Sequence, residues 1–134
     1  MARSVMVVDD AVMMRLVIMN VIESDPQYKV TSNCENGAKA LEALKKADPD
    51  VIMLDMEMPV MDGLAFIREA RLRTTAKIVV LSADVQPGSA KAEQARRLGA
   101  DAVIPKPSGS VSFDLKETTG AKILTTLRRL FPAS

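Results

Sequence analysis

The sequence predicts an α/β protein in which a parallel five-stranded sheet lies between two layers of helices. Short runs rich in Val, Ile, Leu or Met alternate five times with segments whose apolar residues recur at helical spacing. Residues that end helices or strands separate these segments, for example Asp25-Pro26, Asp48-Pro49 and Gly99. Such alternation is typical of parallel sheets joined by right-handed crossovers.

The predicted strands are short, and four of the five are apolar along nearly their whole length. Strands of this kind are usually buried on both faces of a sheet. The five ranges are 4–8, 29–34, 51–54, 77–81 and 102–104.

A helix is predicted after each strand, because the apolar residues in these segments fall three or four positions apart. The connection before the last helix, residues 106–120, is longer than the usual 2–6 residues or so and is expected to carry local structure or a contact surface. The apolar stripes are Met14, Val17, Ile18, Val21 and Ile22; Ala40, Leu41, Leu44 and Ala47; Leu64, Ile67 and Ala70; Ala92, Ala95 and Leu98; and Ile123, Leu127, Leu130 and Phe131.

The composition favours one soluble domain over residues 1–134 and excludes several functions. The 18 Lys and Arg nearly cancel the 17 Asp and Glu, so the net charge of +1 gives no reason to expect nucleic acid or an anionic membrane as a partner. No apolar run approaches the roughly 20 residues that cross a bilayer, and no signal peptide is evident, so a cytoplasmic location is expected. The lone Cys34 is expected to pack in the core.

Histidine is absent from the chain. A Ser-His-Asp triad and a zinc site of the usual Cys and His type are therefore excluded. Any chemistry must use carboxylates, hydroxyls and lysine.

Polar residues follow four of the predicted strands. Asp9 and Asp10 end the first strand, Asp55 the third, Ser82 the fourth and Lys106 the fifth. Ligands of open parallel sheets bind outside the carboxyl ends of the strands, so these groups converge if the first and third strands are neighbours. A single Asp after a strand is more often a helix cap or a turn residue, but the joint pattern favours a site.

Three neighbouring carboxylates repel one another. For one pair about 4 Å apart, an effective dielectric constant near 20 gives roughly 4 kcal/mol. A hard divalent cation with oxygen ligands, Mg²⁺ or Mn²⁺, would offset this repulsion. One acid could then attack a phosphoryl group, and Asp55 is held at its strand end for that purpose.

Four motifs in order resemble the receiver domain of two-component response regulators: VVDD at 7–10, MLDMEMPVMDG at 53–63, LSA at 81–83 and PKP at 105–107. The resemblance covers essentially the whole chain. It implies a doubly wound, flavodoxin-like (βα)5 three-layer sandwich with strand order 2-1-3-4-5. The stretch PKPSGSVSFDL resembles the N-terminal receiver of chemotaxis methylesterases. The chain has no methylesterase domain, so it would be a stand-alone relative or a regulatory fragment, and not an enzyme.

The resemblance implies roles for the acids. Asp55 would accept a phosphoryl group from the phosphohistidine of a sensor histidine kinase. Asp10, Asp55 and the backbone carbonyl of Glu57 would ligate Mg²⁺, and Asp9 would act on the metal mainly through water.

It also implies a phosphate-binding set and one departure from the family pattern. Ser82 and the amide of Ala83 would contact the phosphoryl oxygens, and Lys106 would pair with them. The peptide bond from Lys106 to Pro107 would be cis. Receivers often carry Tyr or Phe on the fifth strand, where this chain has Val103, so the usual aromatic switch is in doubt.

The predicted function is a phosphorylation-dependent signalling switch. Phosphorylation would change how the face formed by the fourth helix, fifth strand and fifth helix binds a downstream protein or output domain. The protein would be a monomer or a phosphorylation-dependent dimer. The alternatives are a phosphate-independent receiver-like interaction module, a flavin-binding protein and an aspartyl phosphatase. The last two lack their usual first-loop residues, because DDAVMM stands there.

Two further groups of residues have a structural and a functional interpretation. Basic residues on the last helix, Lys122, Arg128 and Arg129, are expected to form a solvated face rather than a dock for an acidic partner. Methionines near the site are expected to fill the core rather than to bind a partner. They are Met13, Met14, Met56, Met58 and Met61.

Overall fold

Strands and helices alternate along the chain as the sequence predicts. The computed structural model describes residues 2–58, 61–82, 89–105 and 119–132. In chain order the elements are β1 (Arg3–Val8), α1 (Val12–Glu23), β2 (Tyr28–Cys34), α2 (Gly37–Leu44), β3 (Val51–Asp55), α3 (Gly63–Ala70), β4 (Lys77–Ser82), α4 (Ala90–Leu98), β5 (Ala102–Pro105) and α5 (Gly120–Leu130).

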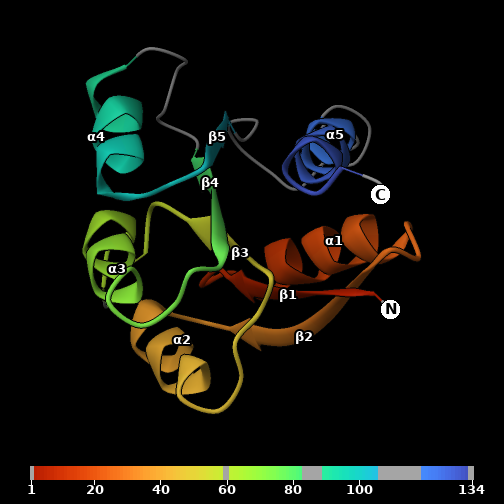
Figure 1. Cartoon of the computed structure of the whole chain (residues 1–134), viewed down its shortest axis with the longest axis horizontal. Helices are drawn as coiled ribbons and strands as arrows, with labels where there is room; N and C mark the ends of the chain where they lie inside the picture. The colour runs from red at the N-terminus through yellow and green to blue at the C-terminus, as the bar shows by residue number, and fades with distance from the viewer. Residues whose placement is uncertain (1, 59–60, 83–88, 106–118, 133–134) are drawn as a thin grey trace.

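The five strands form one parallel sheet in the order β2-β1-β3-β4-β5 (Figure 1). The first and third strands are therefore neighbours, with Val8 opposite Leu54. The strand order reverses between β1 and β3, which is where ligands of such sheets bind. The predicted fold class and strand order are confirmed.

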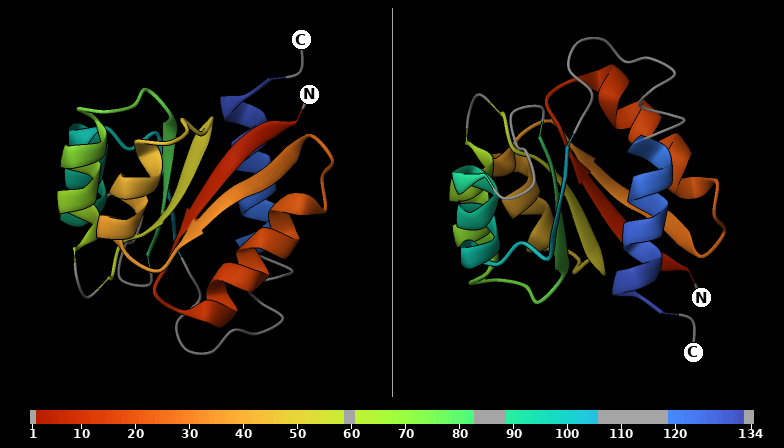
Figure 2. Two further views of the ribbon diagram at one scale, coloured as in Figure 1. Left: turned by 90° about the horizontal axis from the view of Figure 1, so that it is seen from below. Right: turned by 90° about the horizontal axis from the view of Figure 1, so that it is seen from above.

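Helices cover both faces of the sheet, so the molecule has three layers (Figure 2). α2, α3 and α4 lie on one face, over a core that includes Ile52 and Leu54. α1 and α5 lie on the other, over a core that includes Val51 and Met53. Successive side chains of β3 thus point to opposite faces, and burying each large one contributes about 1.5–3 kcal/mol.

Strand and helix bounds differ from the predicted ones in an informative way. β3 and β4 include Asp55 and Ser82 as their last residues, whereas the sequence placed both just after a strand. Asp55 pairs with Leu81 of β4, so the sheet fixes the backbone position that carries this carboxylate. α2 ends at Leu44, so Ala47, which the sequence placed in the helical stripe, lies outside the helix.

β2 is the one predicted strand without a continuous apolar run, and it lies at an edge of the sheet. Only its terminal residues, Tyr28 and Cys34, are buried. Burial raises the pKa of the Cys34 thiol, so the neutral form is favoured. The expected packing role of Cys34 is confirmed by its place in the core.

Side-chain caps start three of the helices. Asn36, Asp62 and Ser89 accept hydrogen bonds from the backbone N–H three residues on, at 2.8, 2.9 and 3.2 Å. Capping of α3 therefore accounts for Asp62 in the MLDMEMPVMDG motif, and this acid needs no role in chemistry. Within the described ranges, every helix is too short or too polar to cross a bilayer.

Candidate functional site

Three carboxylates meet at the edge of the sheet where the strands have their carboxyl ends. Asp9 and Asp10 follow β1, and Asp55 ends the neighbouring strand β3. One oxygen from each of the three carboxylates lies within 4.8 Å of the other two. The side chains that the sequence predicted to converge after the first and third strands are therefore together.

Local hydrogen bonds fix the two buried acids. The Asp9 N–H donates to the Cys34 carbonyl at 3.0 Å, and Asp9 Oδ1 accepts from the Ala11 N–H at 2.9 Å. Asp55, only 3% exposed, accepts at Oδ1 from the Glu57 N–H at 3.1 Å. These bonds keep the carboxylates oriented.

The donor set suits a hard divalent cation. All three groups are carboxylates, two buried and one, Asp10, exposed. Burial weakens solvent screening of their mutual repulsion, which a cation would offset. The exposed side leaves room for water and phosphoryl oxygens in the coordination shell, as Mg²⁺ prefers. The residues present therefore fit Mg²⁺, which Asp9, Asp10 and Asp55 would hold.

Ser82 lies at the end of β4 and is fully buried. Its hydroxyl donates a hydrogen bond to Oε2 of Glu57, and Nζ of Lys91 lies 3.4 Å from the same oxygen. The family resemblance placed the backbone carbonyl of Glu57 at the site, but the sequence gave no indication of a role for Lys91. That residue lies on α4, 34 positions from Glu57, in a segment whose only recognisable signal is a short stripe of small apolar residues.

Val103 is half-buried on β5 and packs against the core under α2, α3 and α4. It stands opposite Val80 in the sheet. Three other predicted site residues, Ala83, Lys106 and Pro107, lie outside the described residues, as does the predicted cis bond.

Magnesium should stabilise the fold through the three acids. At a concentration about 100 times its Kd, Mg²⁺ adds about 2.7 kcal/mol to the free energy of unfolding if it binds only the folded chain. We expect Asp10→Asn to lose most of this gain, because the variant removes an exposed, charged ligand. Urea unfolding with Mg²⁺ or EDTA at equal ionic strength measures the effect. Asp48→Asn, an exposed acid in the α2–β3 connection, is the control; an undiminished gain in Asp10→Asn would contradict this site.

Curated relatives align with most of this chain. It is 42% identical over 113 residues to a protein-glutamate methylesterase/protein-glutamine glutaminase of Halalkalibacterium halodurans, covering 84% of this chain and 33% of the relative. A protein of the same name from Pyrococcus horikoshii is 41% identical, over 84% of this chain and 31% of its own. The chain thus spans about a third of the length of these relatives.

Solved structures agree with the fold. The response regulator domain of Thermotoga maritima CheB superposes with a TM-score of 0.90 at 30% identity, covering 100% of this chain and 99% of that one. A chain from the complex of the P1 domain of CheA3 with CheY6 from R. sphaeroides gives 0.78 at 47% identity, over 98% of each chain. Residues 5–115 match the response regulator receiver domain family. With its acids gathered where the strand order reverses, the chain belongs to the response regulator receiver domain family.

Proposed function

We propose that residues 1–134 form a receiver domain that acts as a phosphorylation-dependent switch, with Asp55 as the phosphoacceptor. The proposal depends on one observation: Asp9, Asp10 and Asp55 each place a carboxylate oxygen within 4.8 Å of the other two, at the end of a buried strand. The proposal covers the chain either as a stand-alone regulator or as the regulatory part of a chemotaxis methylesterase. The chain itself would promote only its own phosphorylation and dephosphorylation.

The proposed reaction is a phosphoryl transfer from a kinase phosphohistidine. An oxygen of the Asp55 carboxylate attacks phosphorus, the bond between nitrogen and phosphorus breaks, and the leaving imidazole nitrogen keeps the electron pair. The hydrogen bond that the Glu57 N–H donates to Asp55 Oδ1 orients the carboxylate for attack. Bound Mg²⁺ would neutralise charge on the carboxylates and the transferred oxygens. Ser82, Ala83 and Lys106 are the proposed contacts of the phosphoryl group.

An exposed apolar patch beside the acids supports docking of a kinase domain. Val12, Met13 and Leu16 in the first turns of α1 are 59%, 61% and 52% exposed. The prediction that methionines near the site fill the core is therefore wrong for Met13. It is confirmed for the other four, which are buried or packed against the two cores: Met14, Met56, Met58 and Met61.

We expect Leu16→Asp to slow phosphoryl transfer from a phosphorylated kinase histidine domain about tenfold or more, because a charge in a desolvated interface centre costs at least 1.4 kcal/mol. The rate with acetyl phosphate should not change, since that donor needs no docking surface. Radiolabel transfer measures both rates.

Leu72→Asp is the matched control, because Leu72 is 81% exposed and lies between α3 and β4, at the opposite end of the strands. Equal slowing in both variants would contradict docking on α1. Failure of the unmodified chain to accept phosphate from either donor would overturn the proposed function.

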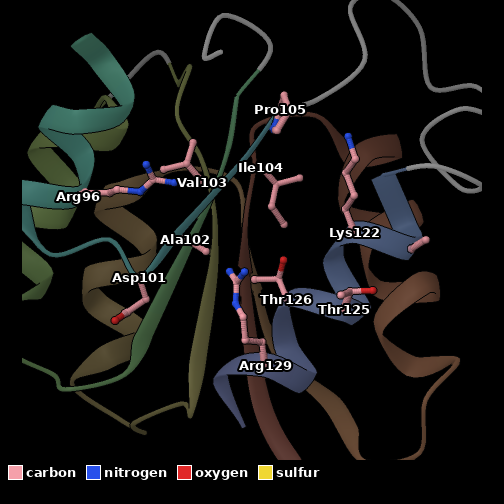
Figure 3. A pocket seen from close by; sticks show the side chains of 11 residues that line it. Arg96, Asp101, Ala102, Val103, Ile104, Pro105, Lys122, Thr125, Thr126 and Arg129 are labelled. Atoms are coloured by element: carbon pink, nitrogen blue, oxygen red, sulfur yellow. The ribbon is translucent and has the colours of Figure 1, made fainter. Parts of the chain in front are cut away.

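A cationic groove supports the face of α4, β5 and α5 as the output surface (Figure 3). The groove holds about 470 Å³ and lies along β5, an edge strand. Among the described residues that line it, three are basic, Arg96, Lys122 and Arg129, and one is acidic, Asp101. The described lining residues are Arg96, Asp101, Ala102, Val103, Ile104, Pro105, Ala121, Lys122, Thr125, Thr126 and Arg129.

The described lining of the groove has an excess of positive charge, even though the whole chain is nearly neutral. Oδ2 of Asp101 lies 3.3 Å from Nη2 of Arg71 and accepts from the Ile78 N–H at 2.9 Å, so its charge is already paired. Arg128 on α5 pairs with Asp25 instead, at 3.3 Å. Lys122 and Arg129, expected on a solvated face, are exposed and line the groove. This pattern favours an acidic partner or output domain.

A further inference from the structure

One carboxylate connects the proposed phosphoacceptor to α4. Oε2 of Glu57 accepts a hydrogen bond from the Ser82 hydroxyl and lies 3.4 Å from Nζ of Lys91. The N–H of the same residue donates to Oδ1 of Asp55 at 3.1 Å. Glu57 thus contacts the phosphoacceptor, the end of β4 and the first turn of α4 at once.

The Ser82 hydroxyl has one proton and therefore donates one hydrogen bond at a time. In this structure that proton points to Glu57, and Ser82 itself is fully buried. A phosphoryl group on Asp55 would add about −1.5 to −2 charges and three strong acceptors close to this hydroxyl. The phosphoryl group and Glu57 would then compete for one proton while repelling each other.

α4 buries only small side chains completely, and Leu98 at its end is partly buried against the core. Its buried residues are Ala92 and Ala95, whereas α1 buries Ile18, Val21 and Ile22. Because apolar burial scales with side-chain size, α4 is held less firmly than α1. A charged contact at its first turn can therefore bias its position.

We propose that Lys91 is a positioning residue that couples α4 to the phosphorylation state of Asp55 through Glu57, an inference that rests on the proposed function. Lys91 holds the Glu57 carboxylate on Ser82 while Asp55 is unmodified. When the phosphoryl group takes the Ser82 proton and repels Glu57, the ion pair is rearranged and the first turn of α4 follows. Arg96 lies farther along α4 and lines the cationic groove, so movement of the helix changes that surface.

The experiment records backbone amide NMR shifts with and without beryllofluoride and Mg²⁺, a mimic of the phosphoryl group. In the unmodified chain, we expect shifts at Ser82 and along residues 92–98. In Lys91→Ala, the Ser82 shift should persist while the shifts of residues 92–98 fall about twofold or more. Lys91→Arg should restore them, because it keeps the charge and reach. Arg97→Ala, an exposed residue on the same helix, is the control.

A double-mutant cycle separates coupling from a local effect. Glu57→Gln should reproduce the loss in Lys91→Ala, and the double variant should lose no more than either single variant. Glu57→Gln should also bind beryllofluoride several-fold more tightly, because an uncharged side chain competes less for Ser82 and no longer repels the anion.

Each outcome decides a different claim. Unchanged shifts of residues 92–98 in Lys91→Ala, or loss of the Ser82 shift in that variant, would overturn the coupling role of Lys91 and leave the proposed function intact. No beryllofluoride response in the unmodified chain would overturn the proposed function, and the inference with it.

Discussion

Asp55→Asn is expected to abolish phosphorylation by acetyl phosphate in the presence of Mg²⁺. The amide has the shape of the carboxylate, but it lacks the anionic oxygen that attacks phosphorus and forms the acyl phosphate. Intact mass spectrometry should show one added phosphoryl group on the unmodified chain and none on the variant. The same variant should also bind Mg²⁺ more weakly, since one of the three clustered carboxylates becomes neutral.

Asp62→Asn is the matched control, because it removes one carboxylate from the same short segment. Asp62 is the N-cap of α3, and its Oδ1 accepts from the Ala65 N–H. Asn caps a helix about as well as Asp, so α3 and the fold should be preserved and labelling should continue. Retained labelling in Asp55→Asn would show that another acid accepts the phosphoryl group.

The sequence predicts the meeting of the acids because it depends on backbone topology. Once strands and helices alternate with right-handed crossovers, all the carboxyl ends of the strands lie at one edge of the sheet. The positions of Asp9, Asp10 and Asp55 then follow from their places after apolar runs. The extra strand residue at Asp55 does not change this, since it leaves the side chain at the same edge.

The contacts between side chains of distant segments could not be predicted in this way. The pair of Glu57 and Lys91 depends on how far α4 lies from the β3–α3 connection, and no local period encodes that distance. Arg128 pairs with Asp25, whereas Lys122 and Arg129 line the groove. This difference likewise depends on where α5 lies against α1 and β5.

The exposure of Met13 could have been predicted from the sequence of α1. α1 begins VMMRLVIM, which is apolar around most of the helix. Val12 and Leu16 are four positions apart and form a second stripe that also includes Met13, away from the buried Ile18 and Ile22. A helix that covers one face of a sheet buries only one stripe, so the other had to remain exposed beside the acids.

A glycine next to the acceptor segment should be essential to both the fold and the reaction. A Cβ at Gly63 would lie 2.6 Å from Sδ and 2.8 Å from Cα of Met56, the residue after Asp55. The Gly63 N–H also donates to the Met56 carbonyl at 3.0 Å, so the two backbones cannot separate without losing this bond. Gly63→Ala is therefore expected to lower the free energy of unfolding by about 2–3 kcal/mol, as overpacking does. Urea unfolding, with an unchanged slope, measures this loss.

Gly37→Ala is the matched control, because Gly37 also begins a helix beside a methionine. Its Cβ would meet only side-chain atoms of Met61, the nearest at 3.0 Å, and a half-buried methionine can change rotamer. The gain in helix propensity from Gly to Ala offsets part of the strain, so a change within about 1 kcal/mol is expected. The acetyl phosphate reaction should slow in Gly63→Ala, where Met56 is displaced, and not in Gly37→Ala. Equal losses of stability and rate in the two variants would trace the effect to the helix starts and would contradict the role of close backbone contact in holding Asp55.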